Sequence, residues 1–344
     1  MQRRLAIGLA MGAGLLAAAP AAAKDLMGVA CSSPAPVHCP ETGCTSAEVG
    51  DLGNATETKS GRKFFLDYPC DLKAGEKVTF ILSLHGGGSI GNWQRHYFPL
   101  IDFKEKHRLV IATPSGTRNI WVPDQDDAYL QGIVEQVEAA VGKGNIKAFW
   151  FAGHSFGGQT SNRLLNSDFY RQRLTGWVSL SGGRLGSKRE EVRAPIPTGS
   201  GGPGGPPPQP AGTPPGAPMR LAADASILPD FAFSHIYETG EHELTAAGLP
   251  AGSRWAEKLG CKAQGKPREV VDAKAGYVQD TRVQANPNKV WGLKARPGAA
   301  KIYDYPACPG GKVVADVVRI DKGHTEGLEP RVTEEIVKLM LAAK

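Results

Sequence analysis

The sequence predicts one large α/β domain in which helices cover both faces of a mostly parallel central sheet. Three observations favour this fold class. The chain has 344 residues and 41% of them are hydrophobic, which is enough for a single extended core. Short apolar runs of strand length recur along the chain, and several are closed by glycine or proline. Segments with helical spacing of apolar residues separate these runs, and such alternation is typical of parallel strands covered by helices.

The strands are predicted from runs rich in β-branched, aromatic and leucine residues. The run at 78–84 leads into three glycines, and the run at 109–112 is closed by proline, serine and glycine. Both endings are typical of buried strands that turn sharply at the edge of a sheet. The predicted strands are residues 62–68, 78–84, 109–112, 149–152, 177–180, 231–237 and 313–320.

The helices are predicted from apolar residues spaced three or four positions apart. Residues 129–141 carry them at Leu130, Ile133 and Val137, and the glycine at position 142 ends the pattern. A helix is also expected directly after the strand at 149–152. The predicted helices are residues 129–141, 159–169 and 332–341.

The first 23 residues have the pattern of a secretory signal peptide. Arg3 and Arg4 precede an apolar stretch at 5–16, and alanines at 21–23 supply the small residues that a signal peptidase recognises. The stretch is too short and too rich in alanine and glycine for a membrane anchor, so no membrane span is expected. The mature protein is therefore expected to be secreted or periplasmic.

Residues 24–60 are predicted to form an irregular, cysteine-containing extension that precedes the main domain at 61–344. All six cysteines follow the signal peptide, and an even number of cysteines in an exported chain favours disulfides. No pair of histidines or cysteines near Cys39 and Cys44 completes a zinc spacing, so no metal is expected. The sequence leaves open how Cys31, Cys39, Cys44 and Cys70 pair.

One segment interrupts the alternation of strands and helices. Residues 194–218 contain ten prolines and seven glycines. Such a segment has too few apolar side chains to offset the entropy lost on ordering it. We therefore predict a flexible loop between the strands at 177–180 and 231–237.

The charge distribution argues against a nucleic-acid partner. The formal net charge of +6 falls to +4 without the two arginines of the signal peptide. The basic residues are scattered along the chain instead of forming a stripe. No obligate protein partner is indicated either.

A serine motif follows one of the predicted strands. Residues 153–157 read G-H-S-F-G, between the strand at 149–152 and a predicted helix. In the nucleophile elbow of α/β-hydrolases, a sharp turn of this kind holds the serine in a strained conformation with its hydroxyl exposed. Glycines flank the serine because side chains there would collide. We therefore predict that Ser155 is a nucleophile and that the fold is an α/β-hydrolase fold.

A second glycine-rich loop is expected to stabilise negative charge in the reaction. Residues 85–88 read H-G-G-G and follow a predicted strand. Backbone N–H groups of such a loop stabilise the oxyanion formed in acyl transfer, and loss of one donor costs about 2.7–4 kcal/mol. The predicted donors are the N–H groups of Phe156 and Gly87, with Gly88 as a further candidate. His85 is expected to hold the loop in place.

The general base should be a histidine later in the chain than Ser155, because the order in this fold is serine, acid, histidine. His235, His242 and His324 satisfy this order. His235 lies inside a predicted strand, where packing is its expected role. His324 follows the last predicted strand and a glycine, which is where the fold places its base, so we predict that His324 takes the proton of Ser155.

The acid that orients the base should follow the strand at 231–237. The segment 238–243 reads E-T-G-E-H-E and contains no aspartate. We favour Glu243 because it lies three residues after Gly240, which has the position of a strand-end glycine. Glu241 is the alternative.

Together, these motifs resemble the extracellular poly(3-hydroxybutyrate) depolymerase and feruloyl esterase group of α/β-hydrolases. The resemblance implies a Cys261–Cys308 disulfide. The sequence departs from the group in its glutamate acid, in its N-terminal extension and in having no appended polymer-binding module. The likeness begins near residue 62 and includes the segments 84–88, 114–121, 126–127, 153–158, 255–261, 305–308 and 323–324.

The predicted function is cleavage of carboxylic esters through an acyl-enzyme, without cofactor or metal. The resemblance implies aryl or hydroxyalkanoate esters, as small molecules or within a polymer. Trp93 and Trp121 are predicted to bind substrate, and Tyr97 and Phe156 are further candidates for the cleft wall. Two alternatives remain. The first is a different hydrolase on the same scaffold, such as a peptidase or a β-diketone carbon–carbon hydrolase, as for oxidised polyvinyl alcohol. The second is a non-catalytic binding protein.

Overall fold

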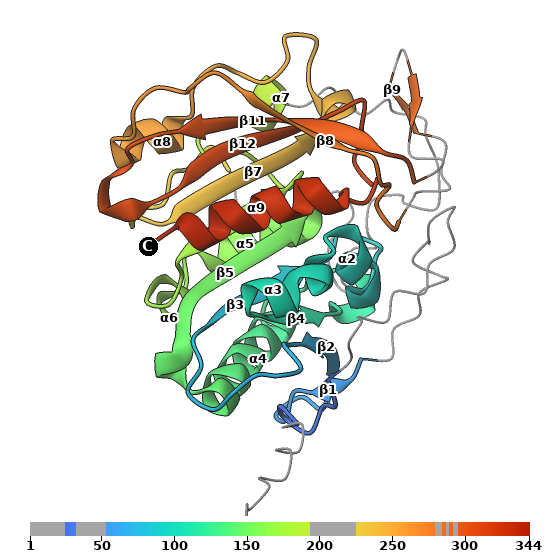
Figure 1. Ribbon diagram of the computed structural model, residues 1–344, viewed down its shortest axis with the longest axis vertical. Helices are drawn as coiled ribbons and strands as arrows, with labels where there is room; N and C mark the ends of the chain where they lie inside the picture. The colour runs from blue at the N-terminus through green and yellow to red at the C-terminus, as the bar shows by residue number, and fades with distance from the viewer. Residues whose placement is uncertain (1–24, 32–52, 193–224, 279–283, 287–288, 292–294) are drawn as a thin grey trace, which may run out of the picture.

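A ten-stranded sheet crosses the molecule in the order β1-β2-β4-β3-β5-β6-β7-β12-β11-β8 (Figure 1). The computed structural model describes residues 25–31, 53–192, 225–278, 284–286, 289–291 and 295–344. The consecutive strands from β4 to β12 in this order are parallel, and antiparallel strands extend the sheet at both ends. The sheet is therefore mostly parallel, as predicted.

The strands and helices have the following bounds. The strands of the main sheet are β1 (Ala55–Thr56), β2 (Lys63–Asp67), β3 (Val78–Leu84), β4 (Leu109–Pro114), β5 (Ile146–His154), β6 (Gly176–Leu180), β7 (Ser234–Gly240), β8 (Arg268–Asp272), β11 (Gly298–Tyr305) and β12 (Val314–Ile320). A separate antiparallel pair consists of β9 (Gln284–Asn286) and β10 (Lys289–Trp291). The α-helices are α2 (Gly91–Tyr97), α3 (Lys104–His107), α4 (Gln125–Val141), α5 (Phe156–Leu164), α6 (Asp168–Arg171), α7 (Arg189–Val192), α8 (Arg254–Leu259) and α9 (Pro330–Ala342). The short 3-10 turns are η1 (Leu100–Phe103), η2 (Thr117–Asn119), η3 (Lys143–Asn145), η4 (Glu241–Glu243) and η5 (Pro309–Gly311).

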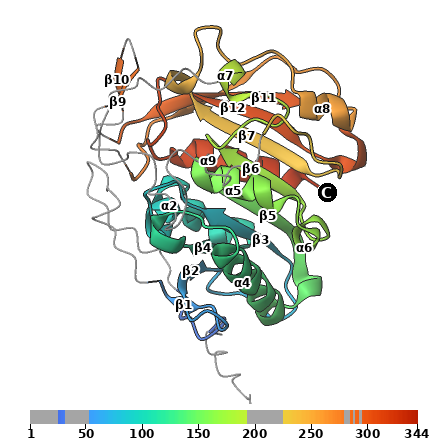
Figure 2. The same cartoon turned by 180° about the vertical axis from the view of Figure 1, so that it is seen from behind.

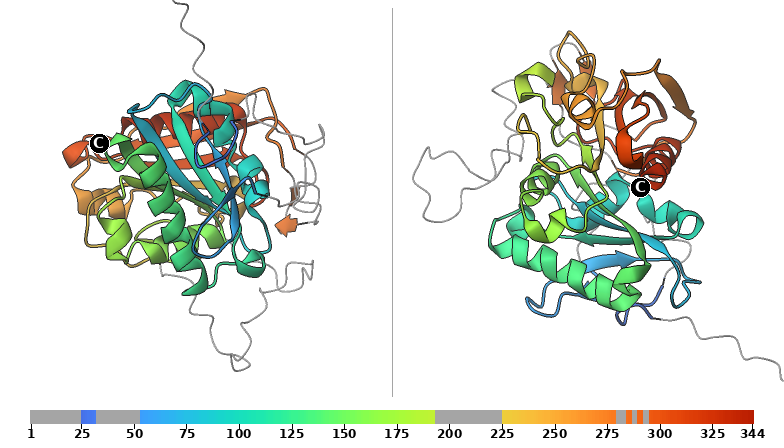
Figure 3. Two further views of the ribbon diagram at one scale, coloured as in Figure 1. Left: turned by 90° about the horizontal axis from the view of Figure 1, so that it is seen from below. Right: turned by 90° about the vertical axis from the view of Figure 1, so that its left-hand side faces the viewer.

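Successive side chains of a central strand enter two different hydrophobic cores. Phe80 and Leu82 of β3 pack in one core with α4, α5, α6 and α8, whereas Ile81 packs in the other with α2 and α9. All residues of β3 are buried, as expected for a strand between two layers of helices. Figures 2 and 3 show these helices on opposite sides of the sheet. The arrangement confirms the predicted α/β-hydrolase fold.

Several elements differ from the prediction. β7 begins three residues later than the strand predicted at 231–237 and ends at Gly240, so η4 follows the strand directly. The helix predicted at 159–169 consists of two helices, α5 and α6. The apolar runs do not predict β8 and β11, because both strands alternate buried and exposed residues and contain charged ones. A strand near the edge of a sheet needs no continuous apolar run, since one of its faces contacts water.

The start of the described chain is tied to the sheet by covalent and polar contacts. A disulfide joins Cys31 to Cys70, with 5.3 Å between the Cα atoms. The hydroxyl of Tyr68 accepts a hydrogen bond from the N–H of Leu26 at 3.3 Å and donates one to the carbonyl of Val29. This part of the predicted extension is therefore anchored beside β2.

A second disulfide joins Cys261 to Cys308, which confirms the pairing that the resemblance implied. It connects the end of α8 to the start of η5. The signal peptide predicted at 1–23, the cysteines Cys39 and Cys44, and the loop predicted at 194–218 lie outside the described residues. None of the helices in the described ranges has the length and apolarity needed to cross a membrane.

Candidate active site

Three loops at the carboxyl ends of parallel strands bring Ser155, Glu243 and His324 together. Ser155 follows β5, Glu243 follows β7 and His324 follows β12. β5, β6, β7 and β12 are consecutive in the sheet, so these loops leave the same edge. The fold thus places residues that are distant in sequence beside one another at the point where ligands bind in α/β proteins.

Ser155 has the strained conformation that a nucleophile elbow requires. Its φ of 50° and ψ of −113° lie outside the regions that L-residues normally occupy. Its N–H donates to the carbonyl of Leu180 at 2.8 Å, which fixes the turn against β6. A Cβ on Gly157 would lie only 2.4 Å from the carbonyl oxygen of Leu84, so glycine is needed there. The turn leaves Ser155 partly exposed.

His324 lies between Ser155 and Glu243. Its Nε2 is 2.8 Å from Ser155 Oγ, and its Nδ1 is 2.7 Å from Glu243 Oε2. With Nδ1 protonated, the imidazole donates to the carboxylate while Nε2 accepts the serine hydroxyl proton. Glu243 is buried, which keeps water away from this pair. The three side chains therefore have the geometry of a serine–histidine–acid triad.

The alternative acid is directed elsewhere. Glu241 is exposed, and its Oε2 accepts a hydrogen bond from the N–H of Asp321 at 2.8 Å. His242 also contacts Asp321, with 2.8 Å between Nε2 and Oδ1. His235 lies inside β7 with its ring tilted against that of Trp177, and burial lowers its pKa to about 3. Glu241, His242 and His235 thus occupy surface or packing positions outside the triad.

The predicted oxyanion donors differ in availability. Gly87 is exposed, and a Cβ built on it would lie 3.6 Å from the Cβ of Phe156, so the two residues are neighbours. Within the described residues, no carbonyl or side chain accepts the N–H of Gly87 or of Phe156. The N–H of Gly88, in contrast, donates to the carbonyl of Asn119 at 2.8 Å. Gly88 is therefore not available as a donor, because its N–H holds the loop to η2.

His85 and Trp121 support the glycine loop from inside. His85 Nε2 accepts the N–H of Gly116 at 2.8 Å, while Nδ1 lies 2.7 Å from the carbonyl oxygen of Gly86. Burial lowers the pKa of His85 to about 4, so the ring is neutral and can accept. The indole N–H of Trp121 donates to the carbonyl of His85 at 2.8 Å. His85 therefore has the structural role that the sequence predicts.

Trp93 and Trp121, which the sequence predicts to bind substrate, are both buried. Trp121 is fully buried by its packing on His85, and Trp93 is 5% exposed and stacks on Tyr97. Tyr97 is itself buried. An aromatic residue near a glycine motif packs as readily in the core as in a cleft, and the sequence does not distinguish the two. Of the aromatic candidates for the cleft wall, Phe156 is partly exposed.

His154 and Tyr97 hold the backbone of His324, a role that the sequence did not predict for either residue. His154 Nε2 lies 2.8 Å from the carbonyl oxygen of His324, and the hydroxyl of Tyr97 donates to the same oxygen at 3.2 Å. The ring of His154 also packs, in a tilted arrangement, against the rings of Tyr97 and His324, with centroid distances of 4.1 and 4.7 Å. His154 is the second residue of the G-H-S-F-G pattern, so the motif itself connects the serine turn to the base.

A buried ionic cluster lies under the loop that carries His324. Lys322 Nζ is 2.7 Å from Glu329, and Arg319 Nε is 2.6 Å from Glu238 Oε1. Glu326 accepts the N–H of Gly323 at 2.6 Å, directly before His324. Burial raises the pKa of Glu238 to about 7, and the Arg319 guanidinium offsets only part of this effect. Four of the five charged groups come from 319–329, and the sequence shows no apolar pattern that would have predicted their burial.

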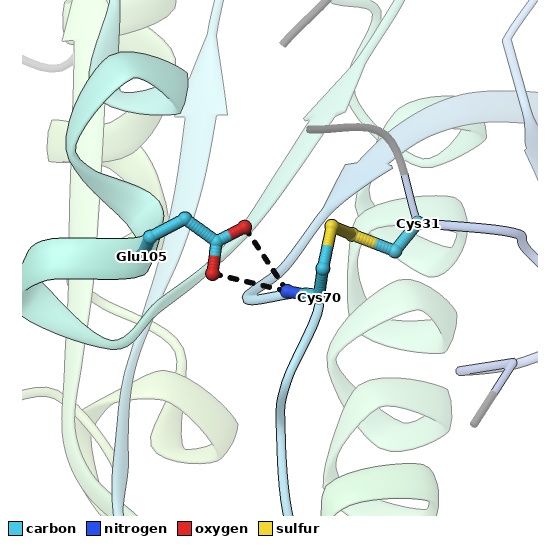
Figure 4. A group of neighbouring side chains, drawn as sticks. All are labelled: Cys31, Cys70 and Glu105. Carbon is cyan, nitrogen blue, oxygen red and sulfur yellow. Dashed lines mark hydrogen bonds between the residues drawn. A yellow bond between two sulfur atoms is a disulfide. The ribbon is translucent and has the colours of Figure 1, made fainter. Parts of the chain in front are cut away.

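One group of potential metal ligands among the described residues comprises Cys31, Cys70 and Glu105 (Figure 4). The two sulfurs are bonded to each other, and both oxygens of Glu105 accept the N–H of Cys70 at 3.0 and 3.1 Å. The buried Lys104 ammonium lies 2.7 Å from Glu105 and 3.6 and 3.7 Å from the sulfurs. Because a positive charge already contacts every member of the group, these residues do not fit a metal ion.

Comparisons with known proteins provide structural likenesses at low identity. No model of a known family matches the sequence. No curated protein matches it either. An acetyl xylan esterase from Aspergillus awamori is similar in structure, with 9% identity, a TM-score of 0.44, and coverage of 81% of this chain and 94% of that one.

Two further solved structures cover less of the chain. The substrate-bound fluorophosphonate-binding serine hydrolase F of Staphylococcus aureus has 16% identity, a TM-score of 0.29, and coverage of 36% of this chain. The butyrate-bound esterase Est2 of the planctomycete Thermogutta terrifontis has 14% identity, a TM-score of 0.31, and coverage of 54% of this chain and 69% of that one. The chain spans about half, 52%, of the Staphylococcus aureus enzyme. The strand order of the sheet and the turn at Ser155 show that the chain has the α/β-hydrolase fold.

Proposed function

We propose that the protein is a secreted serine hydrolase that cleaves carboxylic ester bonds. The observation that carries the proposal is the chain of contacts from Ser155 through His324 to Glu243, with distances of 2.8 and 2.7 Å. A hydroxyl, an imidazole and a carboxylate in this order perform nucleophilic acyl transfer on unrelated folds. The two disulfides support export to an oxidising compartment.

In the proposed acylation step, Ser155 Oγ attacks the carbonyl carbon of the ester while its proton moves to His324 Nε2. The carbonyl oxygen becomes an oxyanion, which the N–H groups of Phe156 and Gly87 stabilise. Glu243 stabilises the imidazolium that has formed. The tetrahedral intermediate then collapses, the C–O bond to the leaving group breaks, and His324 returns the proton to the departing alcohol.

In the proposed deacylation step, water attacks the acyl-enzyme. His324 Nε2 takes a proton from the water, and the same N–H groups bind the second oxyanion. Collapse of this intermediate releases the carboxylic acid and returns the proton to Ser155 Oγ. His324 thus accepts and then donates each transferred proton, and the proposed reaction uses groups of this chain and water alone.

The substrate class rests on the sequence resemblance. Aryl esters and hydroxyalkanoate esters, free or in a polymer, are the proposed substrates. Both bind as esters with an accessible carbonyl, which the partly exposed Ser155 and the exposed Gly87 are able to approach. The esters named for the similar structures are those of the proteins concerned. Hydrolysis of a substrate panel tests which esters this chain cleaves.

The test is hydrolysis of a substrate panel by the purified mature protein and by Ser155→Ala. The panel contains p-nitrophenyl acetate and butyrate, methyl ferulate, a soluble hydroxybutyrate oligomer and a β-diketone. We expect ester turnover that Ser155→Ala lowers by at least about 10⁴-fold. Ser167→Ala is the matched control, because the hydroxyl of Ser167 caps no backbone group of α6, and it should retain parental rates.

Other outcomes of the panel identify the alternatives. Turnover of the β-diketone alone would replace the ester proposal with carbon–carbon bond hydrolysis by the same residues. Equal rates for the parent and Ser155→Ala would refute the role of Ser155. If the protein cleaves no compound of the panel, a binding protein on a hydrolase fold becomes the favoured alternative.

A further inference from the structure

We infer that Ser181 is a fourth member of the catalytic relay, a positioning residue that orients Glu243 so that the carboxylate can hold His324. This inference rests on the proposed function, since it assigns a role within the same site. Ser181 directly follows β6, the strand that lies between the strands carrying Ser155 and Glu243. Its Oγ donates to Glu243 Oε1 at 2.5 Å.

The contacts of Glu243 divide between its two oxygens. Oε2 faces His324 Nδ1, whereas Oε1 faces Ser181, the hydroxyl of Thr239 at 3.3 Å and the N–H of Gly240 at 3.2 Å. The hydroxyl of Thr239 is also 3.4 Å from the carbonyl oxygen of Gly240, so its single proton has a second acceptor. Of these three donors, Ser181 is therefore the closest on the side of the carboxylate that faces away from the histidine.

A glutamate needs this restraint more than an aspartate does. Its side chain has one more rotatable bond, so a carboxylate held by the histidine alone has more orientations available. A donor on Oε1 fixes the rotation about the last bond and leaves Oε2 directed at His324. Ser181 thereby accounts for how this chain accommodates a glutamate at the acid position.

The backbone of Ser181 supports a functional reason for the residue. Its φ of 53° lies in the left-handed region, where a serine is strained and glycine is the usual residue. Two features of the neighbouring backbone, a hydrogen bond and a close approach, accompany this conformation. The N–H of Ser181 donates to the carbonyl of Glu238 at 2.7 Å, and a Cβ on Gly182 would lie only 2.5 Å from the Cα of Gly158. The chain thus keeps a side chain with a hydroxyl group at a position where the backbone conformation favours glycine.

The hydroxyl is also completely enclosed. Ser181 is 1% exposed and Glu243 is 9% exposed, so water does not compete for their hydrogen bond. A buried hydrogen bond to a charged acceptor is stronger than one between neutral groups. Glu238 on β7 interacts electrostatically with Glu243 and is paired with Arg319. Glu238 and His324 are titratable neighbours of Glu243, so both must be considered when the pH profile of a variant is interpreted.

The experiment compares Ser181→Gly with Ser181→Ala. Both remove the hydroxyl, but glycine also relieves the strained φ, so Ser181→Gly should unfold at a temperature equal to or above that of Ser181→Ala. We expect kcat for the best ester of the panel to fall about tenfold to a hundredfold in both variants, the range for one lost hydrogen bond to a charged group. KM should stay within about twofold, because Ser181 does not touch substrate.

The pH profile separates positioning from general destabilisation. Without Ser181, the carboxylate of Glu243 is no longer held toward His324, so it stabilises the imidazolium less. We expect the acid limb of kcat/KM to move to lower pH in both variants. Glu238 keeps its pairing with Arg319 in parent and variants, so its titration contributes equally to every profile.

Ser179→Ala is the matched control. Ser179 is a fully buried serine two residues earlier in β6, and its hydroxyl donates to the carbonyl of Gly183 at 2.8 Å. Its replacement should lower stability without moving the acid limb. In a Glu243→Ala background, Ser181→Gly should change kcat by less than about twofold, because its target is gone.

Several results would overturn the inference. Parental kcat and an unmoved acid limb in Ser181→Gly would do so, as would an undiminished effect of Ser181→Gly in the Glu243→Ala background. The same acid-limb shift in Ser179→Ala would assign the effect to the loop as a whole. Absence of any Ser155-dependent turnover in the parent would instead refute the proposed function, and the relay with it.

Discussion

At the scale of single residues, the geometry around Ser155 depends on positions where a side chain would not fit. A Cβ on Gly86 would lie 2.6 Å from His154 Nδ1 and 3.3 Å from the Cβ of Ser155. The backbone of the glycine loop thus lies directly against the side chains of the turn at Ser155. Since His154 in turn contacts the backbone of His324, the placement of Gly86 affects both the nucleophile and its base.

The change Gly86→Ala tests this contact. The added methyl group must displace His154 or Ser155, which overpacks the site at a cost of about 1–3 kcal/mol in the free energy of unfolding. We expect kcat to fall by about 10²-fold, the effect of a displacement near 1 Å in a catalytic group. Steady-state kinetics and urea unfolding measure the two effects.

Gly144→Ala serves as its control, because a Cβ there would meet no heavy atom within 4 Å. This variant should match the parent in both kinetics and unfolding. Gly86→Ala with parental kcat would show that the close approach of the two loops has no catalytic consequence.

At the scale of elements, the loop after β12 is held by charges instead of an apolar core. Lys322 and Glu329 are both buried and lie 2.7 Å apart, and Arg319 links the same cluster to β7 through Glu238. Such pairs contribute little net stability when complete but leave an uncompensated buried charge when one partner is removed. The cluster therefore fixes the position of the loop that carries His324 more than it stabilises the fold.

The change Lys322→Met should lower the free energy of unfolding by about 3–5 kcal/mol, because Glu329 loses its closest cation. We also expect a lower kcat, since the displaced loop carries His324. Glu334→Gln breaks an ion pair with the largely exposed Lys106 and should cost less than about 1 kcal/mol. Equal unfolding free energies for Lys322→Met and the parent would contradict a structural role for the cluster.

Most elements of the candidate site were predictable because their signals are local. The run at 78–84, the turn at 153–157 and the glycine before His324 each combine strand, turn and chemistry within a few residues. Ser181 and His154 were not predictable as parts of the site, because their roles arise from contacts across the sheet. The burial of Trp121 was not predictable for the same reason, since burial depends on the elements that pack around a residue.

At the scale of the whole molecule, the parallel sheet explains how distant residues meet. Parallel strands end at one edge, so Ser155, Glu243 and His324 converge although up to 169 positions separate them. This convergence was predictable from chain order alone, because the fold assigns each role to a particular strand end. The antiparallel strands β8 and β11 were not predictable from apolar runs, and they extend the sheet beyond β12 without contributing a triad residue.

The proposed mechanism depends on Ser155 being a nucleophile that His324 activates. The most direct test is labelling with a p-nitrophenyl phosphonate ester, whose tetrahedral phosphorus accepts a serine oxygen as an ester carbonyl does. Intact-mass spectrometry and peptide mapping should find one adduct, on Ser155. We expect no adduct on that peptide in Ser155→Ala and much slower labelling in His324→Ala. A protein that remains unlabelled, or one labelled at another residue with Ser155 unmodified, would contradict the claim.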